Sequence, residues 1–389
     1  MAEQHEKALV PQIRFTGFTD PWEQRKLSST CEQLSRTINP LETPNEEFTE
    51  YSMPAFDNNE TAETVIGNSM NSLRKIVDRP CLLVNKLNVR KKRIWHVPRP
   101  EANAVCSSEF VPFSSHSSDL SFIKISLLSE RITAYLESCS SGSSNSQKRV
   151  TPEIIMSSEI IAPSLAEQRR IGAFFDRLDS LITLHQRKYD KLCVLKKSML
   201  DKMFPKGGSL YPEIRFAGFT DPWEQRKLGE LSSEFKSGEF ICADNVSESG
   251  SYPVYGGNGL RGYTTTFNHE GLYTLIGRQG ALCGNVNIAD GKSYFTEHAV
   301  AVKANHLNNT TFLYYLFGTL DLGQYSGQSA QPGLAVSNLV EVEAMVPDKA
   351  EQKKISRVFK TVDSLITLHQ RKLELLRNIK KSMLDKMFV

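Results

Sequence analysis

Apolar residues recur every three or four positions through two long stretches of the chain, residues 165–204 and 349–389. This spacing is the a/d pattern of a coiled coil and predicts two long helices, with Lys, Arg, Asp and Glu on the remaining faces. The predicted seam positions are Ile171, Phe174, Leu178, Leu181, His185, Tyr189, Leu192, Leu195, Met199 and Met203 in the first helix, and Ile355, Val358, Val362, Leu365, His369, Leu373, Leu376, Ile379, Met383 and Met387 in the second.

The two helical stretches belong to an internal repeat. Both contain DSLITLHQRK and KKSMLDKMF at matching positions, and they begin AEQRRI at residue 166 and AEQKKI at residue 350. Residues 11–27 and 212–228 form a second repeated pair, PQIRFTGFTDPWEQRKL and PEIRFAGFTDPWEQRKL. We call these four segments the frame. A repeat of this kind decides the architecture of a chain.

Between the frame segments lie residues 28–150, the first insert, and residues 229–346, the second insert, which show no evident sequence similarity. Uniform sequence divergence after a gene duplication would reduce the similarity of the frame segments as much as that of the inserts. The contrast therefore indicates one task performed twice with two unrelated specificities.

Two matching helices in one chain favour packing about a pseudo-two-fold axis, which makes them antiparallel. We predict an α/β fold in which two globular domains, each with a small irregular β-rich sheet and helices, are joined by two long antiparallel coiled-coil helices. The expected bounds are 1–164 and 205–348 for the domains and 165–204 and 349–389 for the helices. The alternative is that each helix only covers the core of its own domain.

Several chemistries are excluded. No apolar run reaches the roughly 18 residues that a membrane span needs, and the N-terminus lacks the apolar core of a signal peptide, so we expect a cytoplasmic protein. The seven cysteines form no CxxC pair. Residues 257–262 match GxGxxG, but the strand-like Tyr263-Thr-Thr-Thr-Phe267 follows instead of a helix. Residues 290–293 resemble the end of a P-loop, whose first glycine would fall on Val286. We predict no catalytic, cofactor-binding or metal-binding residue.

The net charge of +3 conceals a segregated first insert. Residues 32–63 hold eight acidic residues and one basic residue, whereas residues 74–99 hold nine basic residues and one acidic residue. A basic cluster followed by Trp95 and His96 suits a DNA backbone with a reader of base edges nearby. A solvated loop is the alternative. The candidate DNA-binding residues are Lys86, Arg90, Lys91, Lys92, Arg93 and Arg99.

The second insert has five basic and eleven acidic residues, which argues against a purely electrostatic grip on DNA. Its glycine-rich segments carry Arg, Asn, Gln and Tyr, and Arg, Asn and Gln can contact base edges. Ordinary turns are the alternative reading of these segments. The candidates are Tyr255, Asn258, Arg261, Tyr263, Arg278 and Gln279. The helical stretches are also basic, with nine basic to five acidic residues in 165–204 and eleven to four in 349–389, and could follow phosphates.

Over essentially its full length the chain resembles the specificity (S) subunit of type I restriction-modification systems. The repeated IRFxGFTDPWEQRKL, the paired AEQ starts and the near-identical helices carry the resemblance. YPVYGGNGLRGY, IGRQGALCG and GQSAQPGL are similar to one common type of target-recognition domain in that family. The first insert resembles another type through Cys106-Ser-Ser-Glu-Phe110 and the junction at residues 163–168.

The resemblance implies that each insert is a target-recognition domain that reads one half of a split DNA site, and that the helices fix the spacer. It implies partners: two modification subunits that carry S-adenosylmethionine and methylate a flipped adenine, and restriction subunits that use ATP and Mg²⁺ to cleave. This chain would be non-catalytic and hold none of these cofactors. The alternatives are a nucleotide-dependent enzyme, a stand-alone DNA-binding regulator and a coiled-coil adaptor.

Overall fold

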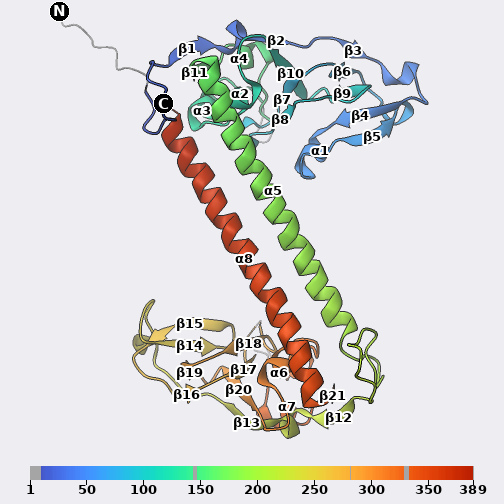
Figure 1. Cartoon of the computed structure of the whole chain (residues 1–389), viewed down its shortest axis with the longest axis vertical. Coiled ribbons are helices and arrows are strands. Elements are labelled where there is room, and N and C mark those ends of the chain that lie inside the picture. The colour runs from blue at the N-terminus through green and yellow to red at the C-terminus, as the bar shows by residue number, and fades with distance from the viewer. Residues whose placement is uncertain (1–9, 143–146, 281, 328–332, 389) are drawn as a thin grey trace, which may run out of the picture. The chain divides into compact units, whose positions relative to one another are not determined.

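The computed structural model describes residues 10–142, 147–280, 282–327 and 333–388 (Figure 1). The chain divides into two compact units. The first holds the described residues up to His185 and those from Lys372 onward, and the second is Gln186–Arg371. None of the described helices combines the length and apolar character that a membrane-spanning segment requires.

The first unit contains three sheets. β1 (Glu23–Lys26) pairs with β11 (Glu159–Ala162). A four-stranded sheet has the order β2 (Cys31–Gln33), β10 (Phe110–Ser115), β7 (Cys81–Asn85), β8 (Ile94–Val97). A five-stranded sheet has the order β3 (Thr37–Ile38), β6 (Arg74–Ile76), β9 (Ala104–Cys106), β4 (Glu47–Tyr51), β5 (Glu63–Ile66). The short helices are α1 (Met53–Asp57), α2 (Leu120–Leu127), α3 (Glu130–Ser138) and α4 (Pro152–Met156).

The second unit repeats this plan. β12 (Glu224–Lys227) pairs with β21 (Glu343–Val346). One four-stranded sheet has the order β13 (Ser232–Ser237), β20 (Ala299–Ala304), β17 (Tyr273–Gly277), β18 (Val286–Ala289). The other has the order β15 (Gly259–Thr264), β14 (Tyr252–Gly256), β19 (Lys292–Phe295), β16 (His269–Glu270). Its short helices are α6 (Thr310–Phe317) and α7 (Val336–Val340).

The two inserts therefore share one strand order, a likeness of fold that their sequences do not show. β2-β10-β7-β8 corresponds to β13-β20-β17-β18, and β6-β9-β4-β5 corresponds to β16-β19-β14-β15. In each insert one parallel pair, β4 with β9 or β14 with β19, lies within an otherwise antiparallel sheet. Very different sequences can specify one fold if they place apolar residues of suitable size in the core. A comparison of the two insert sequences therefore does not reveal their common strand order.

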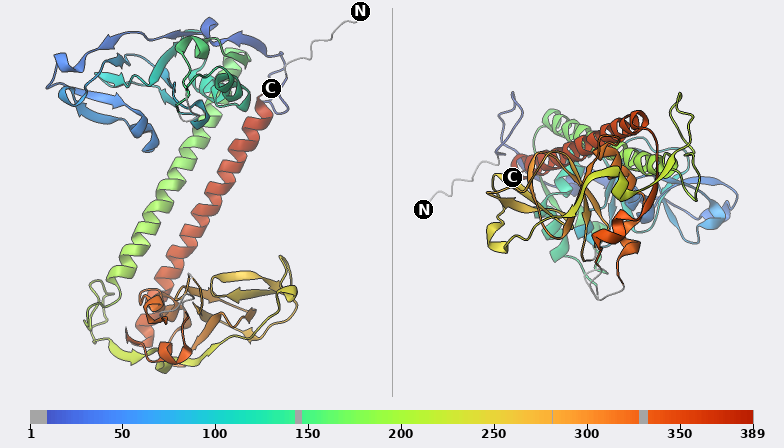
Figure 2. Two further views of the ribbon diagram at one scale, coloured as in Figure 1. Left: turned by 180° about the vertical axis from the view of Figure 1, so that it is seen from behind. Right: turned by 90° about the horizontal axis from the view of Figure 1, so that it is seen from below.

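The long helices are α5 (Leu165–Lys202) and α8 (Lys349–Met387), close to the predicted bounds (Figure 2). Within the first unit Lys380 Nζ lies 2.5 Å from Asp179, and the ring of Phe388 packs on Phe175. As the residue number along α5 decreases from 179 to 175, that of the contacting residue on α8 increases from 380 to 388, so the two helices run antiparallel.

The second unit repeats this pattern, with Lys196 Nζ 2.7 Å from Asp363 and Phe204 packed on Phe359. The prediction of an antiparallel helix pair is confirmed in both units. Two seam positions, Leu195 and Leu365, are exposed instead of packed.

Frame residues and one phenylalanine of each insert build the same aromatic core in each unit. Trp22, Phe122, Phe175 and Phe388 form it in the first unit, and Trp223, Phe312, Phe359 and Phe204 in the second. The central stacked pairs, Phe122 with Phe388 and Phe204 with Phe312, both have ring centroids 5.7 Å apart. The KMF string at the end of each long helix is therefore a core element, which explains why both copies retain it.

The AEQ motifs fix the start of each long helix. Arg14 donates to both oxygens of Glu167 at 2.7 Å, and Arg215 donates to both oxygens of Glu351 at 2.8 and 2.7 Å. The following glutamine accepts the backbone N–H of the residue that caps α2 or α6, Asp119 or Asn309. The repeated segment that precedes each insert (residues 11–27 or 212–228, the entry motif), the insert and the long helix meet at this point in both units.

Candidate nucleic-acid interface

The basic run of the first insert is largely neutralised within its own domain. Of the nine basic residues in 74–99, five pair with carboxylates, namely Arg74, Arg79, Arg90, Lys92 and Arg93. Arg93 makes a two-pronged pair with Asp57 at 2.7 and 2.6 Å. The acidic stretch 32–63 supplies the partners of Arg74, Arg79 and Arg93. The acidic and basic stretches, which are separate in the sequence, thus form ion pairs with each other in the fold.

Four basic residues of that stretch have no carboxylate partner in the described part of the chain. They are Lys75, Lys86, Lys91 and Arg99. Lys91 and Arg99 are exposed, whereas Lys75 and Lys86 are half-buried. Lys75 was not among the sequence candidates, and only its missing partner distinguishes it from its neighbours.

The aromatic residue beside the basic run does not read bases. Trp95 is 5% exposed and packs edge-on against Tyr51, with ring centroids 4.8 Å apart, and against Phe56 and Phe110. His96 is half-buried with Nδ1 3.3 Å from Ser121 Oγ, and burial lowers its pKa. Alternation along β8 directs Trp95 into the core, so Trp95 does not serve as the expected base-edge reader, whereas a reader elsewhere near the basic cluster stays a prediction.

In the second insert the GxGxxG match is a hairpin turn. Residues 257–258 connect β14 to β15, and no helix follows. The turn packs on the end of β17: a Cβ on Gly277 would lie 2.3 Å from the carbonyl oxygen of Gly257. These glycines permit contact between two backbones of the protein itself, as the alternative reading of the segment as an ordinary turn requires.

Gly277→Ala should therefore destabilise the second unit by about 1–3 kcal/mol through overpacking. Thermal unfolding of the full chain would measure the loss. Gly327→Ala is the control, because a Cβ there meets nothing within 4 Å. Equal unfolding temperatures for the two variants would contradict the close contact.

The fold gathers four of the six candidates of the second insert. Tyr255, Asn258, Arg278 and Gln279 lie on β14, its turn and the end of β17, which the glycine contacts bring together. Tyr255 packs edge-on against Phe295, whereas Asn258 and Gln279 are exposed. Arg261 and Tyr263 lie farther along β15, where Tyr263 pairs with Ser247.

Three polar groups that sequence reasoning missed border this cluster. Asn287 Nδ2, Glu297 Oε2 and His298 Nδ1 are buried atoms without a hydrogen-bond partner within the described ranges. Asn287 faces the hairpin turn, since its Oδ1 would lie 3.0 Å from a Cβ on Gly259. They come from β18 and from the loop after β19, so no local pattern could have joined them to the candidates.

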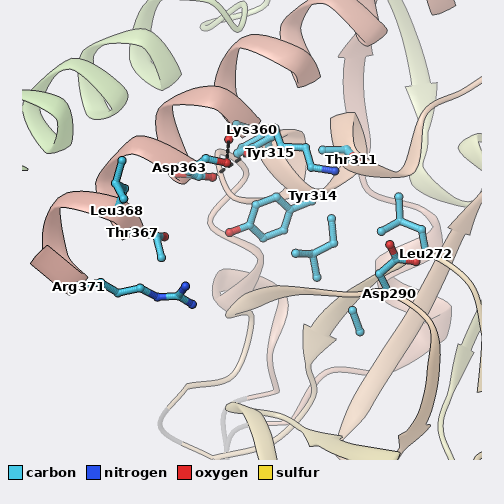
Figure 3. Close-up of a pocket in the computed structure, with 13 residues that line it drawn as sticks. Leu272, Asp290, Thr311, Tyr314, Tyr315, Lys360, Asp363, Thr367, Leu368 and Arg371 are labelled. Atoms are coloured by element: carbon cyan, nitrogen blue, oxygen red, sulfur yellow. Dashed lines mark hydrogen bonds between the residues drawn. The ribbon is translucent and has the colours of Figure 1, made fainter.

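A cavity of about 710 Å³ lies between α6, β18 and α8 (Figure 3). Tyr314, Leu272 and Ile288 give it an apolar lining, and Lys360 and Arg371 of α8 add two cations. Asp363 accepts a 2.7 Å hydrogen bond from Tyr315, whose pKa is raised by burial and by this carboxylate. The predicted basic face of the second helix thus borders a recess in the second unit.

Comparison with known proteins identifies the family. A family model described as the type I restriction modification DNA specificity domain matches residues 20–193 and again residues 220–378. The chain is 41% identical over 146 residues to the Escherichia coli protein named type I restriction enzyme EcoprrI specificity subunit, a match that covers 36% of each chain. It is 24% identical over 249 residues to the putative type I restriction enzyme MjaX specificity subunit of Methanocaldococcus jannaschii, covering 58% of this chain and 57% of that one.

The fold is shared with the crystal structure of the type I restriction-modification system S subunit from M. genitalium. The TM-score is 0.70 at 17% identity, and the alignment covers 98% of this chain and 99% of that one. Because the two family matches together span most of its length, this chain belongs to the type I restriction modification DNA specificity family and carries that domain twice.

Proposed function

We propose that this chain is the DNA-recognition subunit of a type I restriction-modification complex. Each insert reads one half of a bipartite site, and α5 and α8 set the spacer between the halves. The observation that carries the proposal is the doubled family domain on a near-identical frame, at residues 20–193 and 220–378. Two dissimilar inserts on one repeated frame are suited to the recognition of two different half-sites.

The length of the long helices is compatible with a role in setting the distance between the two half-sites. A helix of the 38 residues of α5 is about 57 Å long at 1.5 Å per residue. Half-sites read from one face of DNA lie about 34 Å apart or a multiple of that distance. The helix length is thus of the order that a spacer requires.

In this proposal the chain contributes recognition and its partners contribute chemistry. Two modification subunits bring S-adenosylmethionine and methylate adenine, and restriction subunits bring ATP and Mg²⁺ for cleavage. The internal pairing of the basic run leaves the first insert few unpaired cations, so the partners supply much of the attraction to DNA. The assembly acts on DNA in the cytoplasm.

The test is to co-express the chain with the modification subunit from its own operon and to map methylated adenines in the host DNA. We expect a split motif with a fixed spacer and one methylated adenine on each strand. An assembled complex that leaves host DNA unmethylated would refute the proposal and favour an adaptor or a stand-alone binder.

A further inference from the structure

The two inserts place a basic residue at one equivalent position. We use the term cross-sheet turns for residues 107–109, between β9 and β10, and 296–298, between β19 and β20. Both turns start alike: Ser107 N–H donates to Tyr51 O at 3.1 Å, and Thr296 N–H donates to Tyr255 O at 2.9 Å. Cys106 and Phe295, one residue earlier, are the last residues of β9 and β19.

The basic residue directly follows the strand beside each cross-sheet turn, Lys86 after β7 and Arg278 after β17. Lys86 N–H donates to Glu109 O, and Arg278 N–H donates to His298 O, both at 2.9 Å. On the far side, Val150 N–H donates to Lys86 O and Leu334 N–H donates to Arg278 O. Two inserts without evident sequence similarity thus hold Lys86 and Arg278 by the same backbone bonds.

The first insert adds a second cation at this place. Lys75 lies opposite Cys106 in the β6–β9 register, and Lys86 is bonded to Glu109, so the two lysines flank turn 107–109. Both are half-buried, and neither has an ion pair within the described ranges. Burial lowers the pKa of Lys75, and the charge of Lys86 lowers it further.

Two half-buried like charges without a counter-ion raise the energy of the free protein, and an anion between them would relieve that cost. The turn itself offers donors, because the Ser107 and Ser108 hydroxyls belong to the turn that the two lysines flank, and Ser108 is exposed. The carboxylate of Glu109 is engaged by Arg149 at 2.9 Å. The place therefore has the composition of an anion site.

We propose that Lys75, Lys86 and turn 107–109 form a binding site for one or two phosphates of the DNA backbone, and that Arg278 holds the corresponding phosphate in the second insert. This inference rests on the proposed function and adds which contacts set the position of the DNA. Phosphate contacts fix the register of a protein on DNA, whereas base contacts select the sequence. A shared phosphate site would place the two dissimilar inserts in the same register on the DNA backbone.

The second site should be the weaker one. Arg278 donates through Nε to Leu334 O at 3.1 Å and through Nη1 to Ser237 Oγ at 3.2 Å, which orients the guanidinium and leaves Nη2 for a ligand. However, turn 296–298 carries Glu297 where the first turn has Ser108. A carboxylate beside the arginine reduces the attraction for a phosphate.

The test uses the full chain assembled with its modification subunits and two DNA duplexes, one with the methylated motif and one without it. The dissociation constant is measured as a function of salt concentration. For the double variant Lys75→Gln/Lys86→Gln we expect the slope of log K against log salt to shrink by about 1–2, since each phosphate contact contributes roughly 0.9. Binding should weaken by a similar factor on both duplexes, and the methylated motif should stay the same.

Two further variants keep the test sharp. Lys86→Arg, which installs the residue of the second insert, should retain the wild-type slope. Arg90→Gln/Lys92→Gln removes two cations that are already paired, with Glu137 and Glu130, and should change the slope less. A salt slope for Lys75→Gln/Lys86→Gln equal to that of this control overturns the site.

The outcomes separate this inference from the proposed function. If the wild-type assembly methylates no motif, the proposed function fails. If it methylates a motif and Lys75→Gln/Lys86→Gln keeps its salt slope, only the phosphate site fails. Protection of the wild type against heat by inorganic phosphate, lost in the double variant while its DNA binding is unchanged, would identify a site for free anions and also overturn the proposal.

Discussion

Exchange of residues 28–150 for the insert of another family member will change one half of the methylated motif and leave the other half and the spacer unchanged. The replaced segment lies between Leu27 and Thr151, and the frame closes outside it through the pairing of β1 with β11. The second unit is one continuous stretch, Gln186–Arg371, that contains no part of this segment. Methylation mapping after co-expression with the modification subunit measures the outcome.

The shared strand order makes this prediction stricter. Val150 and Leu334 occupy equivalent positions, so residues 229–334 should fit in place of 28–150. A chain with residues 229–334 in both positions is expected to methylate a motif with two identical half-sites in inverted orientation. A motif in which both halves change after a single exchange, or neither does, would be incompatible with independent readers.

Glu351→Ala will destabilise the second unit by about 3–5 kcal/mol, the usual loss when one partner of a buried ion pair is removed. The side chain of Glu351 is 1% exposed, and that of its partner Arg215 is 14% exposed. The variant leaves the Arg215 guanidinium partly buried without its carboxylate. It also loses the link between the entry motif and the start of α8.

Hydrogen exchange followed through both units is the suitable measurement, because a chain of two units need not unfold in one step. Glu224→Ala is the matched control: Glu224 pairs with Arg226 at 2.7 Å but is 67% exposed, so its loss should cost less than about 1 kcal/mol. Protection in the second unit that falls no more in Glu351→Ala than in Glu224→Ala would show that the pair is not a structural anchor.

The sequence was sufficient to predict the parts of the fold that depend on local periodicity and on repetition. The seam from Ile171 to Met203 predicts α5 to within two residues of its end at Lys202. The repeated KMF and AEQ strings identify the frame, although their roles, with Phe204 in the aromatic core and Glu351 paired to Arg215, are visible only in the structure.

The candidate site was harder to predict, because the fate of a charge depends on distant residues. Arg93 is neutralised by Asp57 and Arg90 by Glu137, partners 36 and 47 positions away. A run of basic letters does not reveal this pairing, and it does not reveal that Lys75 has no carboxylate partner among the residues that the structure describes. Likewise Asn287 and His298 reach the cluster around Arg278 from β18 and from the loop after β19, so only the contacts of the fold group them.

The division of the chain into units also constrains the order of folding during synthesis. Residues 376–388 contribute Leu376, Ile379, Met383 and Phe388 to the core of the first unit. That core cannot be completed until this segment leaves the ribosome, which happens after the second unit, continuous from Gln186 to Arg371, has emerged. The first unit, whose residues are translated first, is therefore the last to complete its core. Until then Trp22 and Phe122 lack their packing partner Phe388.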